Sequence, residues 1–214
     1  MIIHGDFRNF QNENWDGAFV ISDPPYNQNY HYGNYDDNLG HDEYAALLSS
    51  AFAHRKAVVI HYPEETINLL SKILQTCEQV VAWVYPSNTA KQHRLISWWN
   101  CKPDFTKENQ AYRNPTDKRI AQRIKEGKSA RLYDWWEINQ VKNVSKKDNP
   151  HPCPIPYELA RKIISITTNE GDLVIDPFAG SGTIVKAALD SRRKAIGYEI
   201  DLIYAQYAKR EVGE

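Results

Sequence analysis

Short apolar runs rich in β-branched residues alternate along this chain with stretches of helical spacing. The runs cover 2–4, 18–21, 57–60, 80–84, 173–175 and 195–198. Between them, apolar side chains recur every three or four residues over 44–52, 67–74, 159–166 and 184–189. Such alternation is typical of a mostly parallel sheet with helices on both faces. The sequence therefore predicts a doubly wound α/β fold.

The length of the chain suits one α/β domain with an insertion, because 214 residues bury a full core without a disulfide or metal. Its three cysteines, Cys77, Cys101 and Cys153, are far apart and form no CxxC pair, which predicts reduced thiols and no zinc site. No apolar run reaches the roughly 18 residues of a membrane span, and the N-terminus lacks a signal-peptide pattern. We therefore expect a soluble cytoplasmic protein with no metal and no membrane partner.

The charge of the chain is unevenly distributed. The net charge is -1, but residues 88–131 carry eleven lysines and arginines against four acids, so this segment is at +7 and the remainder at −8. A basic segment on an acidic body is typical of a nucleic-acid-binding protein, although a solvated helix face would look the same. The candidates for phosphate contact are Lys91, Arg94, Arg113, Lys118, Arg119 and Arg123. Because 86–147 lacks clean strand–helix alternation, we expect it to be an insertion at the edge or end of the sheet.

A glycine-rich turn at 176–183 connects an apolar strand to a helix. Gly180 and Gly182 allow the backbone to approach a ligand, and the helix that follows offers unpaired N–H groups. The turn is neither a dinucleotide fingerprint, because Val185 replaces the third glycine, nor a phosphate-binding P-loop, because no Gly-Lys-Ser/Thr follows. Glu199 ends the next strand, 23 residues after Asp176, where a carboxylate can accept hydrogen bonds from both hydroxyls of a ribose.

The sequence Asp-Pro-Pro-Tyr at 23–26 directly follows the strand at 18–21, which places it at the sheet edge where open α/β folds bind ligands. Pro24 and Pro25 stiffen the backbone and remove two N–H donors, while Asp23 and Tyr26 add a carboxylate and a flat ring. This set suits an exocyclic aromatic amine, whose N–H bonds would point at the Asp23 carboxylate and the Pro24 carbonyl. A plain β-turn is also compatible with these residues.

Together the two turns resemble those of the amino-methyltransferases of DNA. Residues 23–26 look like the catalytic (D/N/S)PP(Y/F/W) motif and 176–183 like the cofactor motif, while 5–6 and 151–156 resemble shorter family elements. The order, catalytic motif first, is similar to that of the β class, a circular permutation. The resemblance implies the Rossmann-like S-adenosylmethionine-dependent methyltransferase fold. It implies catalytic roles for Asp23, Pro24, Pro25 and Tyr26, and cofactor contacts from Asp6, Asp176, Phe178, Ala179, Gly180, Ser181, Gly182, Thr183 and Glu199.

The same resemblance implies a reaction. Aspartate at position 23, where serine is associated with cytosine, favours methylation of adenine N6, with the base flipped out of double-stranded DNA. Residues 1–85 and 148–214 would form the core and 86–147 the DNA-recognition segment; a homodimer and a prokaryotic or phage origin are further expectations. The polar, tyrosine-rich stretch at 27–41 would close over the base. The alternatives are N4 of cytosine, adenine in RNA, a protein side-chain amide, and a non-catalytic binding module.

Overall fold

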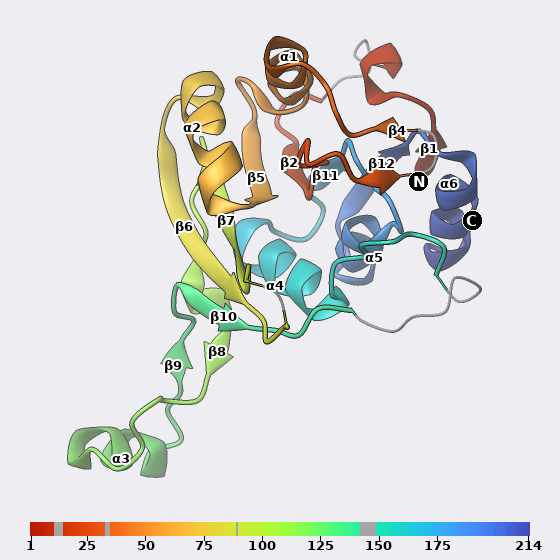
Figure 1. The fold of residues 1–214 in the computed structure, drawn as a ribbon. Helices are drawn as coiled ribbons and strands as arrows, with labels where there is room; N and C mark the ends of the chain where they lie inside the picture. Colours follow the sequence, from red (N-terminus) through yellow and green to blue (C-terminus); the bar gives the residue numbers. More distant parts are fainter. Residues whose placement is uncertain (11–14, 33–34, 89, 142–148) are drawn as a thin grey trace.

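The computed structural model describes residues 1–10, 15–32, 35–88, 90–141 and 149–214. Its centre is an eight-stranded sheet in the order β1-β12-β11-β2-β5-β7-β6-β10 (Figure 1). The pairings along this sheet are parallel except those of β7, which runs antiparallel to both β5 and β6. The strands are β1 Ile2–His4, β2 Phe19–Ser22, β5 Lys56–His61, β6 Cys77–Val84, β7 His93–Trp99, β10 Trp135–Glu137, β11 Leu173–Asp176 and β12 Lys194–Glu199. This architecture confirms the predicted α/β fold and the six strands expected from the apolar runs.

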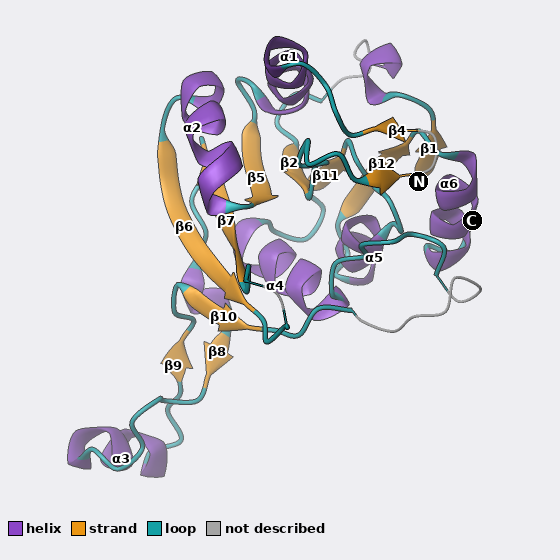
Figure 2. Ribbon diagram, viewed as in Figure 1, coloured by secondary structure: helices purple, strands orange, loops and turns teal. Residues whose placement is uncertain are grey.

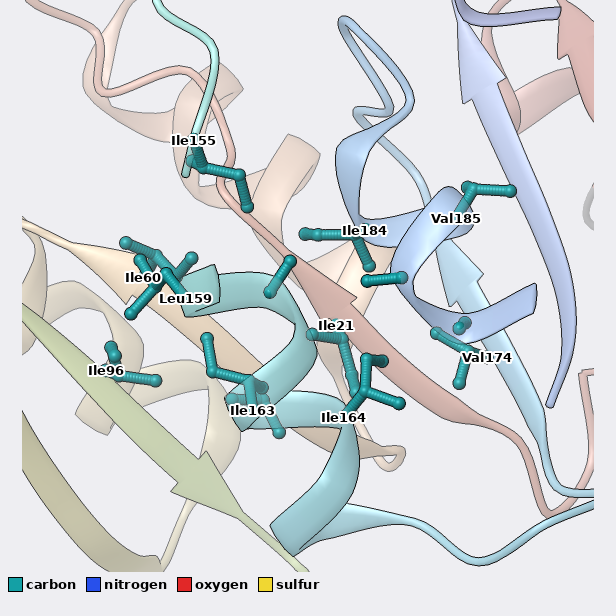
Figure 3. Packing of buried hydrophobic residues seen from close by; sticks show 14 of the residues in the cluster. Ile21, Ile60, Ile96, Ile155, Leu159, Ile163, Ile164, Val174, Ile184 and Val185 are labelled. Atoms are coloured by element: carbon teal, nitrogen blue, oxygen red, sulfur yellow. The ribbon is translucent and has the colours of Figure 1, made fainter. Parts of the chain in front are cut away.

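Helices cover both faces of the sheet. One face packs against α1 (His41–Phe52) and α2 (Pro63–Leu74), and the other against α4 (Tyr157–Thr167), α5 (Thr183–Asp190) and α6 (Leu202–Glu211). Side chains alternate between the two faces, because successive residues of a strand point in opposite directions. Figure 3 shows the second face, where Leu159 and Ile163 of α4 pack near strand residues such as Ile60. All four expected helices are present, whereas α6 had not been expected.

The prediction that 86–147 is an insertion is wrong for two strands within it. Strand β7 lies between β5 and β6, with Ile96 and Trp98 fully buried, and β10 extends the sheet beyond β6. Both strands were missed because β7 begins with the polar residues His93 and Arg94 and β10 has only three residues. Their place in the sheet makes 93–99 and 135–137 part of the core.

A smaller part of that segment extends away from the sheet as an arm, which we define as residues 109–131. It consists of a two-stranded ribbon, β8 (Asn109–Gln110) with β9 (Ala130–Arg131), and the helix α3 (Lys118–Lys125) at its tip (Figures 1 and 2). None of the residues of α3 is buried. The helix at the tip of the arm therefore presents its side chains to solvent, whereas Ala130 at the base of the arm is buried.

Short elements complete the structure. The stretch at 27–41 contains two antiparallel strands, β3 (His31–Tyr32) and β4 (Tyr35–Asp36). Two short 3₁₀ helices, η1 (Phe7–Phe10) and η2 (Phe105–Lys107), lie elsewhere in the chain. No helix in the described part of the chain is long and apolar enough to cross a membrane.

Candidate active site

The carboxyl ends of five parallel strands meet at one edge of the sheet and form a cleft of about 430 Å³. Each strand contributes a residue to its lining: Asp6 after β1, Asp23 after β2, Tyr62 after β5, Asp176 of β11 and Glu199 of β12. The Asp-Pro-Pro-Tyr turn and the glycine-rich turn, which are about 150 residues apart in sequence, therefore line one cavity.

Glu199 holds the glycine-rich turn in place. Its two carboxylate oxygens accept hydrogen bonds from the backbone N–H groups of Gly180 and Asp201, each at 2.8 Å. Gly180 has a φ of +51°, in the left-handed region that favours glycine. Burial raises the pKa of Glu199, and the backbone donors oppose this rise. The carboxylate expected to bind a ribose thus also shapes the loop against which the ribose would lie.

Asp176 connects the two turns. The Ser22 hydroxyl donates a hydrogen bond to the Asp176 carboxylate, which also accepts the N–H of Phe178 at 3.1 Å. Asp176 is 1% exposed, and burial raises its pKa to about 7. No lysine or arginine among the described residues forms an ion pair with it. A positively charged group of a ligand would therefore be favoured beside this carboxylate.

Most of the expected cofactor residues line the cleft, with two qualifications. Phe178, Ala179, Gly180, Ser181 and Thr183 all face it, but Gly182 does not appear in its lining. A Cβ on Gly182 would lie 2.9 Å from the Cβ of Ala208, so this glycine allows α6 to pack closely rather than admitting a ligand. The Asp6 carboxylate faces the cleft but forms a 2.5 Å ion pair with Arg8.

The Asp-Pro-Pro-Tyr turn has one carbonyl that is already bound and one that is open. The Tyr44 hydroxyl donates to the Pro25 carbonyl at 2.8 Å, whereas no donor to the Pro24 carbonyl is found among the described residues. The Tyr26 hydroxyl donates to one oxygen of Asp23, and Nη1 of Arg94 lies 3.4 Å from the other. Burial raises the pKa of Asp23, while Arg94 and Tyr26 act to lower it.

Arg94 does not occupy the surface position expected of a phosphate contact. Because β7 runs antiparallel to β5 and β6, its first residues lie at the edge of the sheet where β5 and β6 end. The guanidinium is buried in the cleft wall, with its carbon 5.1 to 5.3 Å from the ring centroids of Tyr26, Tyr62 and Trp83. Arg94 is therefore a residue of the cleft wall and not the surface phosphate contact that was expected. Reading 93–99 as a strand would have placed Arg94 at this edge.

The other expected DNA contacts lie in two places. Lys91 lines the cleft, with Nζ 4.5 Å from the ring centroid of Tyr62. Arg113, in the arm, lies over Trp135 at 4.5 Å, and Lys118, Arg119 and Arg123 are exposed on α3. Of these residues Lys91 lines the cleft, whereas Arg113, Lys118, Arg119 and Arg123 belong to the arm.

The tyrosine-rich stretch is held against the cleft by Asp37. The buried carboxylate of Asp37 accepts the backbone N–H groups of Asn27, Gln28 and Tyr30 at 2.9 to 3.1 Å. As a result Tyr30 and Tyr32 line the cleft. The sequence analysis did not identify Asp37 as the residue that holds this stretch in place. No group of His, Cys, Asp and Glu residues able to hold a metal ion occurs in the described ranges.

The sequence matches known DNA methyltransferases over most of its length. A family model described as DNA methylase, N6_N4_Mtase, matches residues 18–210. Type II methyltransferase M.HpaI of Haemophilus parainfluenzae is 28% identical over an alignment of 210 residues that covers 90% of this chain and 67% of that protein. DNA adenine methyltransferase YhdJ of Escherichia coli K12 is 38% identical over 77 residues, which are 36% of this chain and 26% of that protein.

Solved structures share the fold along the entire chain. The M1.HpyAVI–SAM complex has a TM-score of 0.67 at 22% identity and covers 100% of this chain and 99% of its own. The PvuII DNA methyltransferase, described as cytosine-N4-specific, has a TM-score of 0.65 at 16% identity and covers 100% of this chain and 86% of its own. At these identities the likeness concerns the fold.

Proposed function

The chain belongs to the family of N6 and N4 DNA methylases, and we propose that it methylates N6 of adenine in double-stranded DNA. One observation carries the proposal. The carboxylate of Asp23 and the glycine-rich turn line the same cleft, and the hydrogen bond from Ser22 to Asp176 joins the two turns. An amine bound at Asp23 would thus lie beside a cofactor bound at the glycine-rich turn.

S-adenosylmethionine is the cofactor of this family, and the residues present fit it. The buried Asp176 carboxylate, which has no basic partner among the described residues, suits a cationic group. Glu199 ends β12 and lines the cleft, and the aromatic residue Phe178 lines it too. When bound, the cofactor supplies a methyl group made electrophilic by a positive sulfur.

The residues of the first turn would activate the amine by position and charge. The N6 lone pair of adenine is delocalised into the ring and is a weak nucleophile. Hydrogen bonds from the amine to the Asp23 carboxylate and the open Pro24 carbonyl favour a pyramidal nitrogen aimed at the methyl carbon. When the nitrogen is methylated, Oδ of Asp23 would accept the proton that the nitrogen releases. Burial, which raises the pKa of Asp23, supports this acceptor role.

Two features support adenine in a flipped conformation. Residue 23 is aspartate, the form that the family resemblance associates with N6 of adenine. Asp23 and Tyr26 are largely buried in the cleft wall, so a base could reach them only after leaving the helix stack. Methylation of cytosine N4 is the second candidate, because the family covers both amines and the PvuII neighbour is described as cytosine-N4-specific.

Identification of the product tests the proposal. Duplex DNA is incubated with the enzyme and labelled methyl donor and is then digested to nucleosides. We expect the label in N6-methyldeoxyadenosine. Label in N4-methyldeoxycytidine would overturn the choice of adenine, and DNA binding without transfer would favour a non-catalytic module.

We propose that the arm contacts DNA phosphates. Between residues 109 and 131 there are seven lysines and arginines and only two acids. Replacing Lys118, Arg119 and Arg123 together by glutamine is expected to weaken DNA binding and to lower the slope of log affinity against log salt by roughly 0.9 for each phosphate that the arm no longer neutralises. Binding of duplex DNA across a salt series measures both effects.

The matched control is Arg192→Gln, which removes an exposed arginine that pairs with Glu170 outside the arm and cleft. This variant should keep the wild-type slope. An unchanged slope in the triple variant would remove the arm from the DNA interface.

Two further expectations remain predictions. The family resemblance implies a homodimer, which sedimentation analysis would test, and a cytoplasmic protein of a prokaryote or phage. The relatives named above come from bacteria.

A further inference from the structure

The guanidinium of Arg94 is a buried cation whose hydrogen bonds are incompletely satisfied. Arg94 is 7% exposed, and its Nε has no hydrogen-bond partner among the described residues. Its contact with Asp23, 3.4 Å from Nη1 to Oδ2, is long for a charged hydrogen bond. Arg94 lines the cleft, and because buried polar groups are nearly always hydrogen-bonded, a guanidinium there with incompletely satisfied N–H groups indicates a partner that arrives with the ligand.

Arg94 and Asp23 place a donor next to an acceptor. The amine of adenine or cytosine is a donor, and the ring nitrogen beside it is an acceptor. Guanine and thymine carry the opposite arrangement, with a carbonyl oxygen beside a ring N–H. A carboxylate and a guanidinium side by side therefore complement the edge that carries the amine and oppose the other edge.

We propose that Arg94 donates a hydrogen bond to N1 of the target adenine while Asp23 accepts from its N6 amine, so that Arg94 determines which base edge is accepted. This assignment rests on the proposed function and adds to it a residue that reads the ring. Tyr26, Tyr62 and Trp83 surround the guanidinium and fix its position before the base arrives. Its charge also lies beside the buried Asp23 carboxylate and favours the anionic form that the amine requires.

The test replaces the proposed acceptor atom. Once the methylated sequence has been identified by sequencing of modified DNA, duplexes are made with adenine or 1-deazaadenine at the target, the latter keeping the amine and having C–H in place of N1. Single-turnover transfer is measured for wild type and Arg94→Met. We expect 1-deazaadenine to slow the wild type roughly 10- to 100-fold, the range for a hydrogen bond to a charged group. Arg94→Met should be slow on adenine and show little further loss on the analogue.

For each enzyme we take the ratio of the transfer rate on adenine to that on 1-deazaadenine. Comparing this ratio between wild type and Arg94→Met removes effects that do not involve Arg94, because any change in the intrinsic reactivity of the analogue affects both enzymes equally. Arg94→Lys keeps the positive charge without the planar fork, and it is expected to keep the pH profile of the wild type while losing most of the discrimination. The matched control is Arg161→Met, which breaks a 2.6 Å ion pair with Glu108 outside the cleft and should retain the wild-type ratio.

Three results would overturn the assignment. An equal penalty for 1-deazaadenine in wild type and Arg94→Met would show that Arg94 does not read N1. Sensitivity to 7-deazaadenine alone would place the contact at N7. No transfer to adenine by the wild type would instead overturn the proposed function, and this inference would fall with it.

Discussion

Replacing Asp23 by alanine is expected to lower kcat by at least about 100-fold while leaving the affinity for S-adenosylmethionine close to that of the wild type. In the proposed mechanism the carboxylate holds the amine that is to be methylated, whereas the expected cofactor contacts come from the glycine-rich turn and Glu199. Single-turnover methyl transfer to DNA and calorimetric titration with the cofactor measure the two quantities separately.

This variant needs a control for folding, because it leaves the Arg94 guanidinium buried without its carboxylate. Removal of one partner of a buried ion pair is usually strongly destabilising. The double variant Asp23→Ala/Arg94→Met removes both charges, so it should regain thermal stability and remain inactive. Asp42→Ala, at an exposed position of α1, should keep full activity. Activity in a folded Asp23→Ala protein would contradict the mechanism.

Replacing Glu199 by alanine is expected to weaken cofactor binding by roughly 10- to 100-fold. The substitution removes the acceptor of two backbone N–H groups, at Gly180 and Asp201, and the carboxylate that faces the cleft. We also expect a loss of about 2 kcal/mol or more in the free energy of unfolding, because two buried donors are left without a charged acceptor. Titration with the cofactor and thermal unfolding measure these effects.

Glu199→Gln separates the two contributions. The amide retains one oxygen for one backbone N–H but presents an NH₂ group to the other, so we expect an intermediate affinity. Glu158→Ala, at an exposed site on α4, serves as the control for removal of a glutamate. Wild-type cofactor affinity in a folded Glu199→Ala protein would place the cofactor elsewhere.

The charges of the cleft and of the arm suit different parts of a DNA molecule. Asp23, Asp176 and Glu199 are carboxylates whose pKa is raised by burial at the edge of the cleft. Such a wall favours cations and amines over phosphate, whereas the exposed helix α3 is rich in basic side chains. The phosphate backbone would therefore remain outside the cleft while a single base enters it.

Much of this fold could be predicted from local sequence. Buried parallel strands require continuous apolar runs, so 57–60 and 173–175 identified β5 and β11 directly. The position of Asp23 in the cleft also followed, since side chains that come after parallel strands meet at one edge. These features depend only on the order of residues within one segment.

The features that sequence reasoning missed depend on partners distant in the chain. Strand β7 begins with His93 and Arg94, and only its antiparallel pairing with β5 and β6 reveals why a charged residue there faces the cleft. Gly182 appeared to be a ligand-facing glycine, although the close neighbour that requires it is Ala208 of α6. Neither contact leaves a local pattern, because each joins segments that the sequence separates.

The most direct test of the central claim is the distance between the cofactor's methyl carbon and the Asp23 carboxylate in a crystal structure with bound S-adenosylmethionine. A near-attack contact and one hydrogen bond in series limit this distance to about 6 Å. We expect the cofactor between Glu199 and Asp176, with its methyl group directed toward Asp23. A cofactor bound outside this cleft, or one whose methyl carbon points away from the Asp-Pro-Pro-Tyr turn, would contradict the account.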